Sequence, residues 1–353
     1  MSRTAEISLP QTCRRRLATT IAWPLALAVL VTAAMLTALS IGRFPVSWAE
    51  ILHFLATAAG LSTMEQTRFD ALRNILVDIR LPRVLAAALV GMALASSGAA
   101  FQAVFRNPLV SPGLLGVLAG SAFGAALAMV LDGSWLLVQT LSFTMGLAAV
   151  ALGVGIAHIF GSATMVVLVL GGIVSSALFA ALLSVVKYVA DPLNQLPAIV
   201  YWLMGTLAHA SLDQLAWTAP PLLVAVTAMS ACGRALDALS MGDDEARSLG
   251  VPVTALRYGV IAAATLASAL TVSIAGTIGW VGLIIPHVAR LLLGPGNQLL
   301  LPASALLGAG FLIGADCLAR TVAEVEIPIG IVTEMVGIPL FLLVLHRSRR
   351  GWL

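Results

Sequence analysis

The sequence predicts an all-α, polytopic membrane protein with about ten transmembrane helices and an inverted internal repeat. Of its 353 residues, 60% are hydrophobic and 10% are charged, whereas a soluble domain has about 25% charged residues. Mean hydropathy is +1.02. So few polar side chains cannot cover a globular surface, and lipid is therefore the expected solvent, in which helices or a closed barrel must satisfy the backbone. The apolar runs are often about 20 residues long and do not alternate with polar residues, which favours helices.

The expected spans follow one another in a single transmembrane domain over residues 1–353. They lie at 17–40, 82–103, 113–131, 135–158, 165–188, 212–232, 255–275, 278–293, 302–320 and 328–346. Arg14, Arg15 and Arg16 before the first span resemble the basic region of a signal peptide. The apolar stretch continues to about Ile41 and lacks a clear small-x-small cleavage site, so we expect a retained first span.

Three segments between the spans carry many of the polar residues. Residues 41–80 are mixed in polarity, with a surface helix expected around Val46–Ala59. Residues 189–211 contain Tyr201 and Trp202, and such aromatic residues favour the membrane interface. Residues 233–254 hold the densest charge cluster in the second half of the chain.

The basic residues predict the orientation. With ten spans both ends share a side, and that side carries twelve arginines, namely Arg3, Arg14, Arg15, Arg16, Arg106, Arg234, Arg247, Arg257, Arg290, Arg347, Arg349 and Arg350. The other side carries seven basic residues, namely Arg43, Arg68, Arg73, Arg80, Arg83, Lys187 and Arg320. The positive-inside rule then places both termini in the cytoplasm, with 1–16 as a cytoplasmic tail, 41–80 in the periplasm and 233–254 in the cytoplasm.

The expected repeat rests on five residues that recur at a constant offset of 178. Gly98, Pro108, Leu114, Leu115 and Gly116 return as Gly276, Pro286, Leu292, Leu293 and Gly294. In the span list Gly98 ends an inward-running helix and Gly276 an outward-running one, which indicates an inverted repeat of the kind common in transporters. A chance match among common membrane residues is the alternative.

Several kinds of site are missing from the sequence. No Walker A motif is present, and the single lysine, Lys187, follows no glycine-rich loop, so the chain is expected to bind no ATP of its own. Cys13, Cys232 and Cys317 fit no metal-binding spacing, and we expect no metal site and no cofactor. The basic residues do not cluster on one segment, which argues against a nucleic-acid partner.

Long motifs do follow one another in register along the chain. They occupy residues 80–86, 106–116, 242–251, 279–290, 301–308, 327–333 and 337–339. In order and spacing they resemble the iron-chelate and vitamin B12 (FecCD-type) family of ABC importer permeases over roughly residues 15–347. Trp280 stands where the family usually has Phe. The resemblance implies a homodimer of ten-helix subunits in the cell inner membrane, a pair of cytoplasmic ATPase subunits and a periplasmic substrate-binding protein.

The resemblance also indicates a contact for the ATPase in Met241–Val253. The acidic residues at its start suit a helix N-terminus, and a glycine followed by Pro252 suits the helix end. A short helix with apolar side chains can dock in a groove on a soluble partner; an ordinary solvated loop is the alternative. The expected contact residues are Gly242, Asp244, Glu245, Ala246, Leu249 and Gly250.

Two further groups are expected at the ends and within the spans. Arg80, Arg83 and Arg320 are predicted at the periplasmic edge, where family resemblance makes them docking residues for carboxylates of the binding protein; snorkelling side chains are the alternative. The pathway or gate candidates are Asn107, Pro108, Gly171, Gly172, Ser175, Pro286 and His287. For His287 the alternative is a packed side chain that is hydrogen-bonded to a neighbouring helix. For Gly171, Gly172 and Ser175 the alternative is packing within the subunit.

The function that follows is import of a metal chelate, with a ferric siderophore as the first candidate. Haem, cobalamin and molybdate stay open, because relatives with nearly identical motifs carry them. An ion-coupled secondary transporter would need buried carboxylates, for which Asp316 and Glu334 are the only candidates in the late spans. A membrane-embedded enzyme would need a polar catalytic cluster within the spans, and the sequence shows none.

Overall fold

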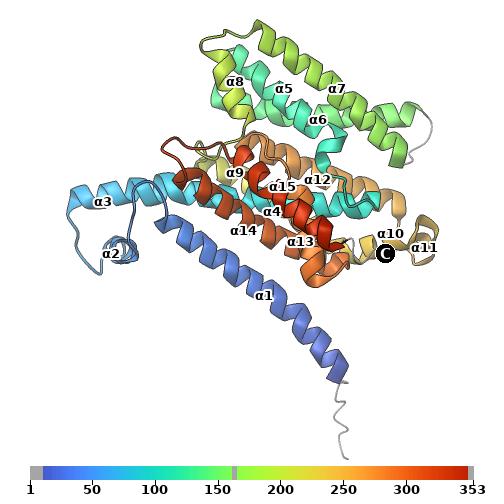
Figure 1. Ribbon diagram of the computed structural model, residues 1–353, viewed down its shortest axis with the longest axis horizontal. Helices are drawn as coiled ribbons and strands as arrows, with labels where there is room; N and C mark the ends of the chain where they lie inside the picture. Colours follow the sequence, from blue (N-terminus) through green and yellow to red (C-terminus); the bar gives the residue numbers. More distant parts are fainter. Residues whose placement is uncertain (1–10, 161–164, 349–353) are drawn as a thin grey trace, which may run out of the picture.

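The computed structural model describes residues 11–160 and 165–348, and within these ranges every regular element is a helix. Figure 1 shows their arrangement. The elements are α1 (Gln11–Ser40), α2 (Trp48–Ala58), α3 (Gln66–Arg73), η1 (Asn74–Arg80), α4 (Leu81–Phe105), η2 (Pro112–Leu115), α5 (Val117–Val130), α6 (Trp135–Ile159), α7 (Met165–Val189), α8 (Gln195–Leu203), α9 (Leu212–Ala231), α10 (Gly233–Met241), α11 (Asp243–Ser248), α12 (Val253–Ala275), α13 (Val281–Leu293), α14 (Asn297–Thr321) and α15 (Ile329–Ser348).

The ten expected spans correspond to ten of these helices. Within the described ranges, six helical stretches are long and apolar enough to cross a membrane alone, and α9 joins α10 at a 46° bend to make a seventh. The apolar helices α5, α13 and α15 are shorter and complete the set. Large apolar side chains such as Leu25, Val166 and Trp217 are exposed, as a lipid-facing surface requires. The prediction of a polytopic all-α protein with about ten membrane helices is confirmed.

Helix α4 forms the centre of the molecule. It packs against α14, α12, α13, α9 and α1, and it is the most buried of the candidate spans. Two glycines permit this packing: a Cβ added to Gly91 would lie 2.2 Å from the Gly308 oxygen, and one added to Gly98 would lie 1.8 Å from the Gly282 oxygen. Small residues that bring helix backbones close together are a common means of association in membranes.

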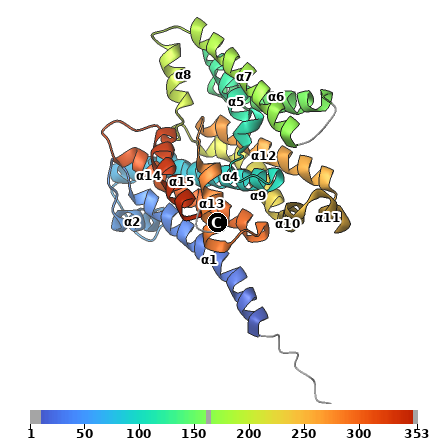
Figure 2. The same cartoon turned by 45° about the vertical axis from the view of Figure 1, so that its right-hand side comes forward.

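The other helices form two groups around this centre. In Figures 1 and 2, α5, α6, α7 and α8 form a separate layer beside α4, α9 and α12–α15, and α1 runs along the opposite side. Figure 1 also places α2 and α3 at one end of the long axis and α10 and α11 at the other. We call these the α2 end and the α11 end; η1 and the start of α4 lie at the first, and the end of α4 lies at the second.

Residues 41–80, which were expected to lie between two spans, form a separate surface element only in part. Their surface helix is α2, as predicted. From Gln66 onward, however, α3 and the π-helix η1 lead directly into α4, so this helical stretch begins well before residue 82. The reason is packing: Leu72 and Leu76 are buried against Ile51 and Phe54 in a small satellite core. Helices α8, α10 and α11 lie within the expected polar segments and were not predicted as separate elements, apart from the short helix at α11.

The internal repeat appears in the order of helix lengths. Helices α4, α5, α6 and α7 have 25, 14, 25 and 25 residues, and α12, α13, α14 and α15 have 23, 13, 25 and 20. As the second and seventh of the ten spans, α4 and α12 run in opposite directions. The offset of 178 does not align equivalent helix ends, because α4 continues past Gly98 to Phe105, whereas α12 ends just before Gly276. The expectation that Gly98 ends a helix was therefore wrong.

Candidate functional site

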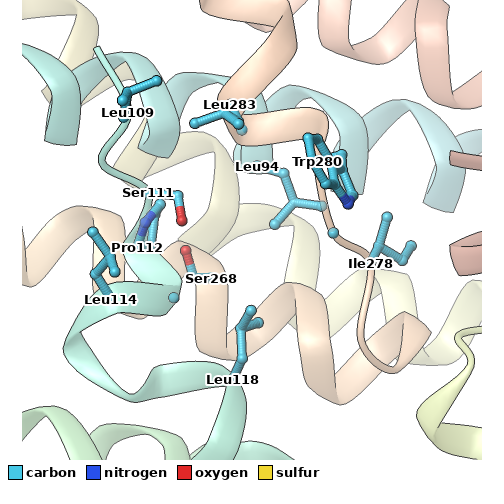
Figure 3. A pocket seen from close by; sticks show the side chains of 13 residues that line it. Leu94, Leu109, Ser111, Pro112, Leu114, Leu118, Ser268, Ile278, Trp280 and Leu283 are labelled. Carbon is cyan, nitrogen blue, oxygen red and sulfur yellow. The ribbon is translucent and has the colours of Figure 1, made fainter. Parts of the chain in front are cut away.

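An apolar pocket lies where the two halves of the repeat meet. Its volume is about 250 Å³, and it is bounded by the loop and short helix before α5 and by the loop before α13. Figure 3 shows Ser111, Pro112 and Leu114 on one side and Leu94, Trp280 and Ile278 on the other. None of the described residues that line it is charged. Breaks between helices at a repeat boundary are where transporters commonly place substrate sites.

The backbone at this pocket is irregular because both connecting loops contain left-handed residues. Trp280 has a φ of +67°, an uncommon value for a bulky side chain, and its ring packs edge-on against Phe341 with centroids 6.1 Å apart. Ser268 of α12 contributes a buried hydroxyl that has no hydrogen-bond partner among the described residues. The pocket therefore offers apolar surface with very few polar groups.

The expected pathway residues do not gather at this pocket. Asn107 and Pro108 lie beyond α4 in a different pocket at the α11 end. Pro286 is buried within α13. Nδ1 of His287 lies 2.9 Å from the Leu283 oxygen of its own helix, not of a neighbouring one, and its ring packs against Phe341.

Gly171, Gly172 and Ser175 make packing contacts within the subunit. A Cβ on Gly171 would lie 2.2 Å from the Gly153 oxygen of α6, and one on Gly172 would lie 2.3 Å from the Leu114 oxygen. Ser175 is buried and donates a hydrogen bond of 2.6 Å to the Ala149 oxygen of α6. These contacts agree with the packing alternative for the three residues, and their place on a pathway stays a prediction.

The segment expected to contact an ATPase forms a compact turn at the α11 end. Gly242 starts α11, and Gly250 ends it with a φ of +80°. The N–H of Gly250 donates to the Arg247 oxygen at 2.9 Å, and that of Val251 donates to the Ala246 oxygen at 3.0 Å. This pair of bonds is the Schellman motif, which favours glycine at the left-handed position. The predicted helix stop is therefore confirmed in its geometry.

The side chains of this segment divide into an anchored and an exposed set. Ala246 is fully buried. Met241 and Leu249 on either side of α11 are 67% and 63% exposed, and Asp244 is 94% exposed. Glu245 folds back over Gly242, because a Cβ there would lie 2.0 Å from its Oε2 atom. The segment therefore presents exposed apolar and charged side chains beside the buried Ala246, and its contact with an ATPase stays a prediction.

Asp243 anchors α11 to two membrane helices. It forms ion pairs with Arg106, at the end of α4, and with Arg257 of α12, the latter at 2.9 Å. Burial opposes its ionisation, but the hydrogen bond and charge of Arg257 and the charge of Arg106 outweigh that effect and hold the pKa of Asp243 below its usual value. The sequence analysis did not single out these partners, because they lie far apart along the chain.

The predicted docking arginines lie in a buried charge cluster at the α2 end. Arg83 donates to Asp316 at 2.7 Å and pairs with Glu326, and Arg320 lies 3.0 Å from the second oxygen of Asp316. Arg80 donates to the carbonyls of Leu39 and Ser40 at the end of α1 and of Phe44 in the loop after it. All three arginines are buried. Internal partners therefore occupy their guanidinium groups, and their contact with a binding protein stays a prediction.

Comparison with known proteins agrees with this architecture. The model of the FecCD transport family matches residues 29–347. The chain belongs to the FecCD transport family. It is 38% identical over 330 residues to the molybdate import system permease protein MolB of Haemophilus influenzae, covering 93% of this chain and 95% of the relative. It is also 38% identical over 286 residues to a protein of Helicobacter pylori named as a probable iron chelatin transport system permease, covering 81% and 86%.

A solved structure shares the FecCD fold seen here. It is described as an inward-facing conformation of a transporter assigned to the metal-chelate type of ABC transporter, with a TM-score of 0.81 and 35% identity over 92% of this chain and 98% of that one. As a member of the FecCD family, the chain is a permease subunit of an ABC importer and lies in a membrane. The names of its relatives differ in substrate, so the family alone does not give the cargo.

Proposed function

We propose that this FecCD permease moves a metal chelate, with a ferric siderophore as the first candidate, across the cell inner membrane. The observation that carries the proposal is the apolar pocket at the repeat boundary, where no charged side chain is present among the lining residues. The pocket is too small to enclose a bulky chelate, but a chelate with an apolar periphery would lose little hydration free energy on passing along its apolar surface, whereas a small oxyanion such as molybdate would have to give up its hydration there without ionic compensation. Haem and cobalamin suit the same surface.

A separate ATPase dimer would drive transport from the α11 end. The exposed Met241, Leu249 and Asp244 form the contact surface, and the Asp243 ion pairs transmit its movement to α4 and α12. This assignment places the α11 end and both termini in the cytoplasm, as the arginine distribution predicts. A periplasmic binding protein would deliver the substrate at the α2 end, and two copies of the permease would enclose the pathway.

Uptake by cells that lack and then regain this gene tests the substrate. Radiolabelled iron bound to a hydroxamate siderophore should accumulate only in the complemented strain, while radiolabelled molybdate should not. Molybdate uptake without siderophore uptake would replace the proposed cargo and leave the permease function intact. The purified permease alone in liposomes should hydrolyse no ATP, and robust hydrolysis by this single chain would contradict the division of labour.

A pair of matched variants tests the pathway. Leu109 lines the apolar pocket, whereas Leu131 directly follows α5 and does not line it, and both are well exposed. Leu109→Trp should narrow the pocket and reduce uptake severalfold, because added bulk removes space that the cargo needs. Leu131→Trp should leave uptake unchanged. Equal uptake by both variants, at equal expression, would show that the pocket is not on the pathway.

A further inference from the structure

A second pocket, of about 330 Å³, lies at the α11 end between α4, α10, α13 and the start of α14. It differs from the apolar pocket in its chemistry. Its lining includes Arg106, Arg290, Asn107, Asn297 and Gln102, and none of the described residues that line it is acidic. The proposed transport pathway and its cargo leave this pocket unexplained.

Arg290 places a charge at this pocket, and it has no acidic partner among the described residues. Its side chain is half-buried on α13, and its one hydrogen-bond partner in the described part of the chain is the neutral Oε1 atom of Gln102, at 2.6 Å. Gln102 is fully engaged, because its amide also lies 3.4–3.5 Å from two α13 carbonyl oxygens. A guanidinium has five N–H donors, and most of those on Arg290 have no hydrogen-bond partner in the described part of the chain. A partly desolvated arginine normally has an anionic partner.

Neutral donors at the same pocket also lack partners. Asn107 is exposed: its Oδ1 atom accepts from the Leu109 N–H at 2.9 Å, and its NH₂ group makes no hydrogen bond within residues 11–160 and 165–348, so it is free to meet solvent or a ligand. The side chain of Asn297 likewise has no hydrogen-bond partner in those ranges, although the residue is buried. Both amides line the pocket with Arg290, so open donors come from three separate elements.

We propose that this pocket binds a tetrahedral oxyanion, with Arg290 as its principal ligand and Asn107 and Asn297 as supporting donors. The planar guanidinium matches the spacing of two oxygens of a phosphate-like group, and amide N–H groups serve the others. Inorganic phosphate, sulfate, molybdate and the phosphate of a lipid headgroup share this chemistry.

The proposed site also adjoins the segment that contacts the ATPase. Arg106 lines the pocket and forms an ion pair with Asp243 at the start of α11. An anion bound beside Arg290 would also attract the guanidinium of Arg106, and would so weaken the ion pair between Arg106 and Asp243. Occupancy of the pocket would therefore loosen the link between α4 and α11, so the site would act on coupling without lying on the pathway.

Titration of the purified full-length permease tests the site. Molybdate, sulfate and phosphate are each titrated by calorimetry at low ionic strength onto protein in nanodiscs of zwitterionic lipid. Arg290→Gln should weaken binding at least about tenfold, because a charge-assisted hydrogen bond to the anion is lost. Arg234→Gln is the matched control: Arg234 is an exposed arginine of α10 outside the pocket, and its removal should leave affinity unchanged. Asp243→Asn should raise affinity, because it releases Arg106.

A second set of nanodiscs distinguishes the source of the anion. If a lipid phosphate fills the pocket, nanodiscs with phosphatidic acid, whose phosphate is terminal, should suppress the titration more than nanodiscs with phosphatidylserine at a similar surface charge; if a free anion fills it, these two sets should show the same affinity. Either result supports the site. The proposed site would be overturned if the wild type bound no anion, or if the wild type and a correctly folded Arg290→Gln bound the anion equally well.

Discussion

The charged side chains at the two ends of this permease differ in burial and in pairing. At the α2 end, Arg83 and Arg320 are buried and share Asp316, so the ionic groups are satisfied inside the fold. At the α11 end, Asp244 and Arg247 pair with each other on an exposed helix, and Arg290 has no acidic partner among the described residues. Internal ion pairs hold helices together at the α2 end, while the α11 end keeps charged and apolar side chains exposed, where a partner can reach them.

The difference matters because burying a charge without a partner costs free energy. Removing one member of a buried ion pair leaves the other without compensation, which costs far more than loss of an exposed pair. The α2 cluster also joins distant segments, because Arg80 and Arg320 donate to carbonyls at the end of α1 and in the loop after it. At the α11 end, Asp243 is the only carboxylate in the described chain that ties α11 to α4 and α12.

The largest expected effect is at Asp316. Asp316→Asn should lower the free energy of unfolding by about 3–5 kcal/mol, because Arg83 and Arg320 lose their shared buried carboxylate. Denaturant titration in mixed micelles measures this change. The matched variant at the other end, Asp244→Asn, should change stability by less than about 0.5 kcal/mol. Similar losses at both positions would remove the contrast between the ends.

A smaller effect is expected where α11 ends. Gly250→Ala should destabilise this turn by about 1–2 kcal/mol, because alanine is strained at its φ of +80°. Hydrogen exchange of the amides of residues 243–251 should accelerate, and uptake should fall while the rest of the chain keeps its protection. Gly259→Ala on α12, where an added Cβ meets no neighbouring atom, is the control. Normal exchange and uptake in Gly250→Ala would make the segment an ordinary loop.

The anchor at Asp243 sets the next effect. Asp243→Asn should loosen α11 by about 1 kcal/mol, since these ion pairs are only partly buried. The wild type should show the same loosening in acid: a lowered pKa means that the ion pairs stabilise the segment above the ordinary carboxylate range, and that this stability is lost as pH falls through the pKa in the folded state. Hydrogen exchange of α11 against pH measures both changes. A pH-independent difference between wild type and variant would contradict the ionic anchor.

The smallest effect concerns docking at the α2 end. Glu326 is 23% exposed and is the outer partner of Arg83. If Arg83 binds carboxylates of a delivery protein, Glu326→Gln should tighten docking by about two- to fivefold, because an internal competitor is removed. Titration of labelled binding protein onto the permease–ATPase complex at low and high salt measures this. Charge reversal at Arg83 is a poor test, because Arg83→Glu would bury three carboxylates together. Unchanged affinity in Glu326→Gln would leave the cluster with a purely structural role.

The sequence by itself determined the class of the protein, the approximate position of ten helices and the family. These depend on local properties: an apolar run of sufficient length must form a helix in lipid, and motif residues keep their order along the chain. The end of α11 was also predictable, because glycine and proline act on the backbone within a few residues. The start of the helical stretch that leads into α4 could not be predicted, because burial of Leu72 and Leu76 depends on α2, which lies elsewhere in the sequence.

Only the tertiary structure decided how the charged residues are partnered. Arg83 and Asp316 are separated by 233 positions, and Arg106 and Asp243 by 137, so no local pattern could show that one pair is buried and the other half-exposed. The same holds for Ser175, whose hydroxyl donates a hydrogen bond to the Ala149 oxygen of α6. Burial and ion pairing depend on which helices pack side by side, and that choice is made by contacts between segments far apart in the chain.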